Sequence, residues 1–132
     1  MTFATPPSLD DIETLARESW EAMAPEFRAL ASGIIFRVED FADEEVLAEM
    51  GIDDPFELSG LYQGVDLTQQ SIADPRPSTP MVFLYRRAIL DEWIERGDVS
   101  LADLVAHVLV HEVGHHFGLS DEQMDEILER AD

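Results

Sequence analysis

Apolar side chains recur at helical spacing near the start of the chain, with Ser8 before them where an N-cap belongs. The positions on this face are Ile12, Leu15, Ala16, Trp20 and Met23. Pro25 interrupts the pattern, and Gly33 follows a short helical stretch at residues 26–32. The pattern predicts an amphipathic helix up to Pro25 and one or two further helical turns before Gly33.

Short runs of β-branched and aromatic residues predict strands at 34–38 and 81–86. Residues 51–80 are punctuated by glycine and proline, and we expect only a brief strand or turn at 58–67. Between and after these segments, the pattern indicates short helices at 43–50 and around Leu90, Trp93 and Ile94. They should end at Gly51 and Gly97, respectively.

The longest uninterrupted helical pattern runs from Leu101 to Phe117, after Ser100 and Asp103 in the arrangement of a capping box. Apolar residues occupy almost the whole circumference of this helix, which is typical of a central, buried helix. Gly118 is the expected C-cap. A last short helix is predicted to begin at Ser120.

This apolar helix carries several ionisable residues, and burying such groups is costly unless they are paired or coordinate a metal. They are His107, His111, Glu112, His115 and His116. Residues four apart lie on one helix face about one turn from each other, so His111 and His115 can converge on one ion. Glu112 projects beside them, where it can hydrogen-bond a metal-bound water.

The pattern His-Glu-x-x-His is that of zinc proteases. Zinc lowers the pKa of its bound water toward about 7, and the glutamate takes the proton as the water attacks a carbonyl. A third protein ligand is needed, which leaves one coordination position for water and substrate. Cysteine is absent, so the ligands must be histidines and carboxylates.

From His111 to Asp121 the chain reads HEVGHHFGLSD, which resembles the zincin superfamily, in particular small bacterial zincin-like metallopeptidases with the pattern HExxHxxGxxD. The resemblance implies that His111, His115 and Asp121 are zinc ligands and that Glu112 is the general base. Asp125 and Glu122 are the alternatives to Asp121. The chain departs from related families because Met124 is not placed as a metzincin Met-turn and no NExxxE helix is present.

We interpret the residues near the motif mainly as structural ones. We expect His107 to line the cleft or to support a ligand, and His116 to be a packing or surface histidine. Tyr62 and Tyr85 are interpreted as structural aromatics, although either is an alternative for polarising the substrate carbonyl. Residues 81–86 are expected to form an edge strand, which by the same resemblance binds an extended peptide by strand addition. The irregular segment 74–80 is expected to border the cleft as a lid.

The 132 residues carry a formal net charge of −21, with eight arginines and no lysine. Such a charge disfavours nucleic acid and anionic membranes as partners. We interpret it as serving solubility or a salty environment, with a preference for basic peptide substrates as the alternative. The start of the chain shows no signal-peptide pattern, and no apolar run approaches the ~20 residues of a membrane span. We therefore expect a cytoplasmic location.

Together these patterns predict one domain over residues 1–132 with an α+β, minimal zincin-like fold: a small mixed sheet packed on the central helix, followed by a short C-terminal helix. The predicted activity is zinc-dependent hydrolysis of peptide bonds in a peptide or protein substrate, by metal-activated water with Glu112 as base. A non-catalytic zinc-binding or protein-interaction module on the same scaffold is the main alternative, and hydrolysis of a non-peptide amide is another. The oligomeric state stays open.

Overall fold

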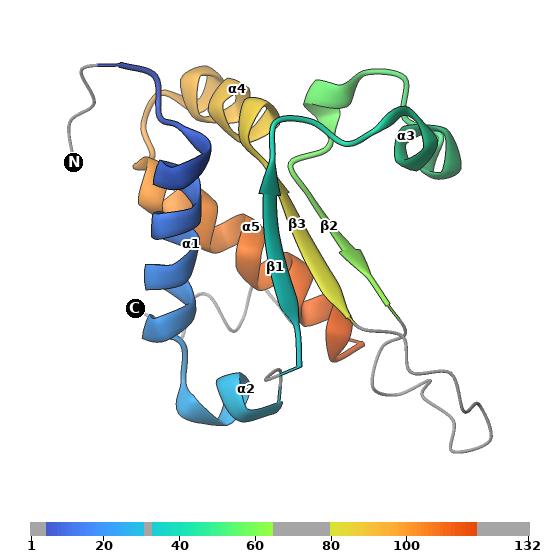
Figure 1. Ribbon diagram of the computed structural model, residues 1–132. Coiled ribbons are helices and arrows are strands. Elements are labelled where there is room, and N and C mark those ends of the chain that lie inside the picture. The colour runs from blue at the N-terminus through green and yellow to red at the C-terminus, as the bar shows by residue number, and fades with distance from the viewer. Residues whose placement is uncertain (1–4, 31–32, 65–79, 119–132) are drawn as a thin grey trace.

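The computed structural model describes residues 5–30, 33–64 and 80–118 (Figure 1). The described elements, in chain order, are α1 (Leu9–Ala22), α2 (Pro25–Leu30), β1 (Ile35–Glu39), α3 (Glu44–Met50), the 3-10 helix η1 (Pro55–Glu57), β2 (Gly60–Gln63), β3 (Met81–Tyr85), α4 (Arg86–Arg96) and α5 (Leu101–His116). The helices and strands predicted within these ranges are confirmed. The predicted C-terminal helix and lid segment lie outside the described residues, except for Pro80.

Short polar side chains begin three of the helices. The hydroxyl of Ser8 accepts a hydrogen bond from the amide of Asp11, whose carboxylate accepts one from the Ser8 amide. Asp43 and Ser100 likewise accept from amides in the first turns of α3 and α5. These bonds satisfy N–H groups that have no partner inside a helix, which explains why the helices begin at these residues.

The three strands form one mixed sheet in the order β1-β3-β2, with β1 parallel and β2 antiparallel to β3. The expectation that residues 81–86 form an edge strand is therefore wrong, because β3 is the central strand. Its sequence explains why: Val82 and Leu84 enter one apolar cluster, whereas Phe83 and Tyr85 belong to another on the opposite face. A central strand that contributes to an apolar cluster on each face is apolar throughout.

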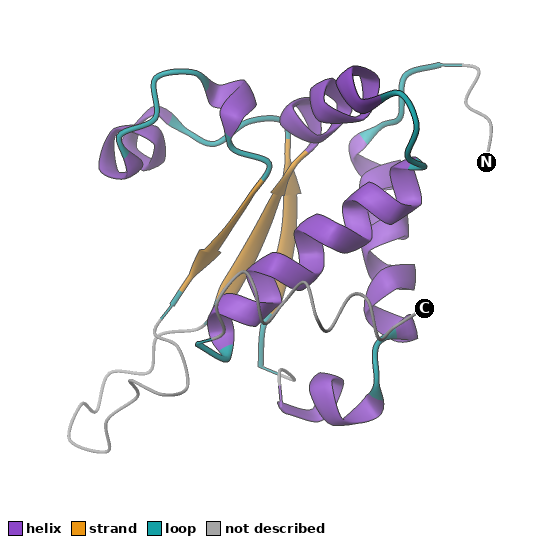
Figure 2. Cartoon of the chain, turned by 180° about the vertical axis from the view of Figure 1, so that it is seen from behind, coloured by secondary structure: helices purple, strands orange, loops and turns teal. Residues whose placement is uncertain are grey.

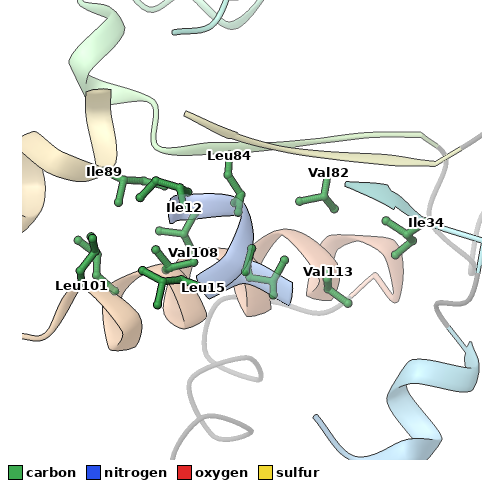
Figure 3. Close-up of a cluster of buried hydrophobic side chains, with 13 residues drawn as sticks. Ile12, Leu15, Ile34, Val82, Leu84, Ile89, Leu101, Val108 and Val113 are labelled. Atoms are coloured by element: carbon green, nitrogen blue, oxygen red, sulfur yellow. The ribbon is translucent and has the colours of Figure 1, made fainter. Parts of the chain in front are cut away.

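The main core lies between α1, α5 and one face of the sheet, as Figure 3 shows for its side chains. Seen from behind in Figure 2, α5 crosses this face diagonally, with α1 beside it. Ile12, Val82, Leu84, Val105 and Leu109 are fully buried or nearly so. This packing fixes α5 against the sheet and thereby sets the position of every residue on it.

Helix α5 is less enclosed than its apolar composition predicts. Its buried side chains gather on one side, whereas Ala106 and Val110 are only half-buried and His115 is exposed. One flank of α5 is thus left accessible, and this flank carries the predicted metal-binding histidines.

Among the described residues, no helix is both long enough and apolar enough to span a membrane.

Candidate metal centre and cleft

His111 and His115 lie in the last two turns of α5, next to its buried side. His111 is half-buried, and 50% of the His115 side chain is exposed. Their four-residue spacing places both imidazoles on one flank of the helix, about 6 Å apart along the axis. The C-terminal end of a helix carries partial negative charge, which favours a cation near these residues.

The carboxylate of Glu112 lies between this flank and the sheet. Its side chain is only 15% exposed, and Oε1 is 3.9 Å from Nε2 of His115. The Glu112 stem packs directly beneath Gly60, at the start of β2. A Cβ added to Gly60 would lie 2.7 Å from Cγ1 of Val108 and 3.0 Å from Cγ of Glu112. Only glycine allows the strand to approach the helix this closely.

Strand β2 is the sheet edge that runs over α5. The amide of Tyr85 donates to the carbonyl of Ser59 at 2.9 Å, so Ser59 and Leu61 direct their backbone groups toward β3. By the alternation of an antiparallel ladder, Gly60 and Tyr62 direct theirs outward. The outer backbone edge of β2 therefore includes Gly60, the residue that contacts Glu112.

The His111 ring packs against the ring of His107, which lies four residues earlier on α5. The two ring centroids are 4.3 Å apart, with planes tilted by 38°. His107 also lines a cavity of about 170 Å³ at the junction of α4 and α5. The other lining residues are Arg96, Val99, Asp103 and Leu104. His107 thus both lines this cavity and contacts His111.

Among the described residues, His111 and His115 offer two imidazole nitrogens, which are donors that suit zinc, and the Glu112 carboxylate lies beside them. In residues 5–30, 33–64 and 80–118 there is no group of three histidines or carboxylates placed to hold an ion. Asp121, Glu122 and Asp125, the predicted third ligand and its alternatives, lie outside these ranges. The chemistry of the two described imidazoles is thus compatible with zinc.

A model of the zincin-like metallopeptidase family matches residues 31–130 of the chain. The chain belongs to this family. The matched span includes all three strands and the whole of α5. No curated protein matches the chain significantly. Family membership indicates zinc-dependent hydrolase chemistry of the peptidase type in general.

The two tyrosines considered for carbonyl polarisation lie on different faces of the sheet. Tyr85 is 2% exposed in the second apolar cluster. Burial, followed by the charges of Glu39 and Asp43, raises the pKa of Tyr85 to about 12. Tyr62 is half-buried and packs against the main core, on the face that carries α5. Tyr62 is therefore the tyrosine on the side of the family motif.

Gly60 is the site residue that sequence reasoning missed. The sequence shows it only as one of several glycines between residues 51 and 80. Its importance comes from the close approach of two elements about 50 residues apart, β2 and α5. No local signal in the sequence marks such a contact. The side chain of His116, predicted to be a packing or surface residue, lies outside the described part of the structure.

Proposed function

We propose that this protein is a zinc-dependent peptidase in which His111, His115 and Asp121 hold the metal and Glu112 is the general base. The observation that carries the proposal is the position of Glu112, which is mostly buried beneath Gly60 and 3.9 Å from the imidazole nitrogen of His115. When bound, zinc supplies a Lewis acid that makes its coordinated water acidic and stabilises the developing oxyanion.

In this proposal the Glu112 carboxylate takes the proton of the attacking water and passes it to the departing amine. The contact with Gly60 holds the stem of Glu112 in place, so that the carboxylate is positioned before the substrate binds. His111 is oriented from its other side by the His107 ring. The half-exposed His115 leaves the reacting position open to a substrate.

The substrate is an extended peptide aligned along the outer edge of β2. The outward backbone N–H and C=O of Gly60 would pair with it through main-chain hydrogen bonds, which places a peptide bond close to Glu112. Such pairing recognises the backbone of any peptide, so a preference for particular substrate side chains must come from the residues around the site. The net charge of −21 favours basic peptides.

Replacing Glu112 by Gln tests the role of the base separately from metal binding. Purified wild-type protein and the variant should hold the same amount of zinc, whereas cleavage of a peptide library should fall at least about a hundredfold in the variant. Glu49→Gln, an exposed glutamate on α3, is the matched control and should leave cleavage unchanged. Cleavage that survives in Glu112→Gln would exclude this residue as the base.

Measuring the zinc bound by single variants would identify the metal ligands. His111→Ala and His115→Ala should each lower zinc affinity strongly, and Asp121→Asn should do so more than Glu122→Gln or Asp125→Asn. Removal of the metal with a chelator should abolish cleavage, and added zinc should restore it. A protein that binds zinc through these residues but cleaves no peptide would instead be the non-catalytic module.

A further inference from the structure

Within the described residues, the face of the sheet opposite α5 is covered only at one end. In Figure 1 the strands are seen from this side, and no described helix crosses in front of them. Strand register places Ile35, Met81 and Gln63 in one row across this face, and Arg37, Phe83 and Leu61 in the next. These six residues form what we call the open face.

The open face is apolar and accessible. Ile35, on the outer strand β1, is 48% exposed and takes no part in the proposed reaction. Met81, Phe83 and Leu61 are only partly buried. A contiguous apolar surface of this kind marks an interaction site, whereas single exposed apolar residues are ordinary. Ile94, which is 76% exposed on α4, is such a single residue.

The segment that borders the open face is strongly acidic. Residues 39–57, which include α3 and η1, contain nine of the 29 acidic residues of the chain and none of its eight arginines. The segment adjoins the open face because Leu47 and Ile52 pack in the same apolar cluster as Leu61 and Phe83. Burial raises the pKa of Tyr85 to about 12, and the negative charges of Glu39 and Asp43 at this end of the sheet add to the rise.

We propose that the open face docks a basic amphipathic helix of a partner protein, with apolar residues against Ile35, Met81 and Phe83 and basic residues toward the acidic segment of α3 and η1. Three strands at a spacing of about 4.8 Å give a floor roughly 10 Å wide between the outer strands, which matches the diameter of one helix. Helix-in-groove recognition of this kind uses an apolar stripe for affinity and flanking charges for orientation.

The distribution of charge also favours one orientation of the partner helix and disfavours association of two copies of this chain. Arg37 lies on the β1 side of the open face, so basic residues of the partner are directed toward the β2 side, where the acidic segment lies. A second copy of this chain would bring two acidic segments and two chains of charge −21 together, which is unfavourable. A basic partner would instead be attracted to the acidic segment.

The test uses the full chain and a fluorescent synthetic peptide of about 14 residues, with leucines along one helical face and lysines beside them; its helix is ~21 Å long. A scrambled peptide of the same composition is the first control. Fluorescence anisotropy should show that the amphipathic peptide binds, that the scrambled one binds far more weakly, and that added salt weakens binding. The Glu112→Gln variant should bind as the wild type does, because docking does not depend on catalysis.

Matched variants locate the binding site. Glu49→Gln, Asp53→Asn and Glu57→Gln change three exposed carboxylates of the acidic segment, and together they should weaken binding about tenfold. Glu18→Gln, Glu21→Gln and Asp98→Asn make the same chemical changes at exposed positions elsewhere and should have little effect. The two triple variants have equal net charge, so their difference measures position alone.

Ile35→Ser should weaken binding several-fold, and Ile94→Ser, at the isolated isoleucine of α4, should not. Equal losses in the paired variants, equal binding of the scrambled peptide, or no binding at all would overturn the proposal. A dimer in sedimentation that Ile35→Ser converts to monomer would also overturn it, because a second copy would then occupy the open face.

Discussion

Replacing Gly60 by Ala should lower both the stability and the proposed activity, because the added methyl group has no room. Its carbon would lie 2.7 Å from Cγ1 of Val108, 3.0 Å from Cγ of Glu112 and 3.3 Å from the carbonyl oxygen of Phe83. The first contact is too short to persist, and backbone and side chains on both elements must move. Overpacking of this kind costs about 1–3 kcal/mol in the free energy of unfolding.

Thermal and urea unfolding would measure this loss, with about 4 °C in Tm expected for each kcal/mol in a chain of this size. Gly33→Ala is the matched control, because nothing lies within 4 Å of the added carbon there. The control should be neutral or slightly stabilising, since alanine restricts the unfolded chain. Cleavage by Gly60→Ala should fall about tenfold to a hundredfold beyond any loss of folded protein, because Glu112 is displaced.

A double-mutant cycle identifies the clash itself. Val108→Ala removes the methyl group that would lie nearest the new carbon, so it should cost less in the Gly60→Ala background than in the wild type. We expect a favourable coupling of about 1 kcal/mol. Strictly additive losses, or a Gly60→Ala protein as stable as the Gly33→Ala control, would refute the close packing of β2 on α5 that underlies the site.

Three further predictions concern the scaffold. Leu109→Ala empties a fully buried position on α5 and should cost about 2–5 kcal/mol by urea unfolding. Ser100→Ala removes the hydroxyl that accepts from the Asp103 amide and should cost about 1 kcal/mol; an unchanged midpoint would contradict its capping role. The raised pKa of Tyr85 means that its stabilising contribution is complete below pH 10 and is lost as the pH rises through about 12. Tyr85→Phe should remove that part of the alkaline loss, and tyrosinate absorbance should show one late-titrating group in the wild type only.

The helices could be predicted because their signals are local. Ser8 and Ser100 mark helix starts by bonds to amides three residues away. Gly51 and Gly97 mark helix ends because they adopt the left-handed conformation, with φ of 67° and 73°. The metal-binding pattern was visible for the same reason, since its spacing of four residues is set by a single helix turn. Each of these features needs only a few consecutive residues.

The arrangement of the strands could not be predicted in the same way. The run Met81–Tyr85 was assigned to an edge, although its unbroken apolar character fits a central strand with an apolar cluster on each face. The true edge beside α5, β2, has only four residues and one glycine, so it carries little strand signal. The role of Gly60 depends on a contact with α5, and a pattern read along the chain contains no information on such a contact.

The candidate site and the core share the same few atoms, which has a consequence for how this protein tolerates change. Val108 and Glu112 lie one turn apart on α5, and both contact the position of Gly60. Val113, next to Glu112 in sequence, is 3% exposed in the main core. Substitutions that loosen this packing should therefore lower activity before they unfold the protein, because a shift of a few tenths of an ångström moves Glu112 but leaves the core formed. Substitutions on the exposed flank of α1 or α4 have no such connection and should change neither property.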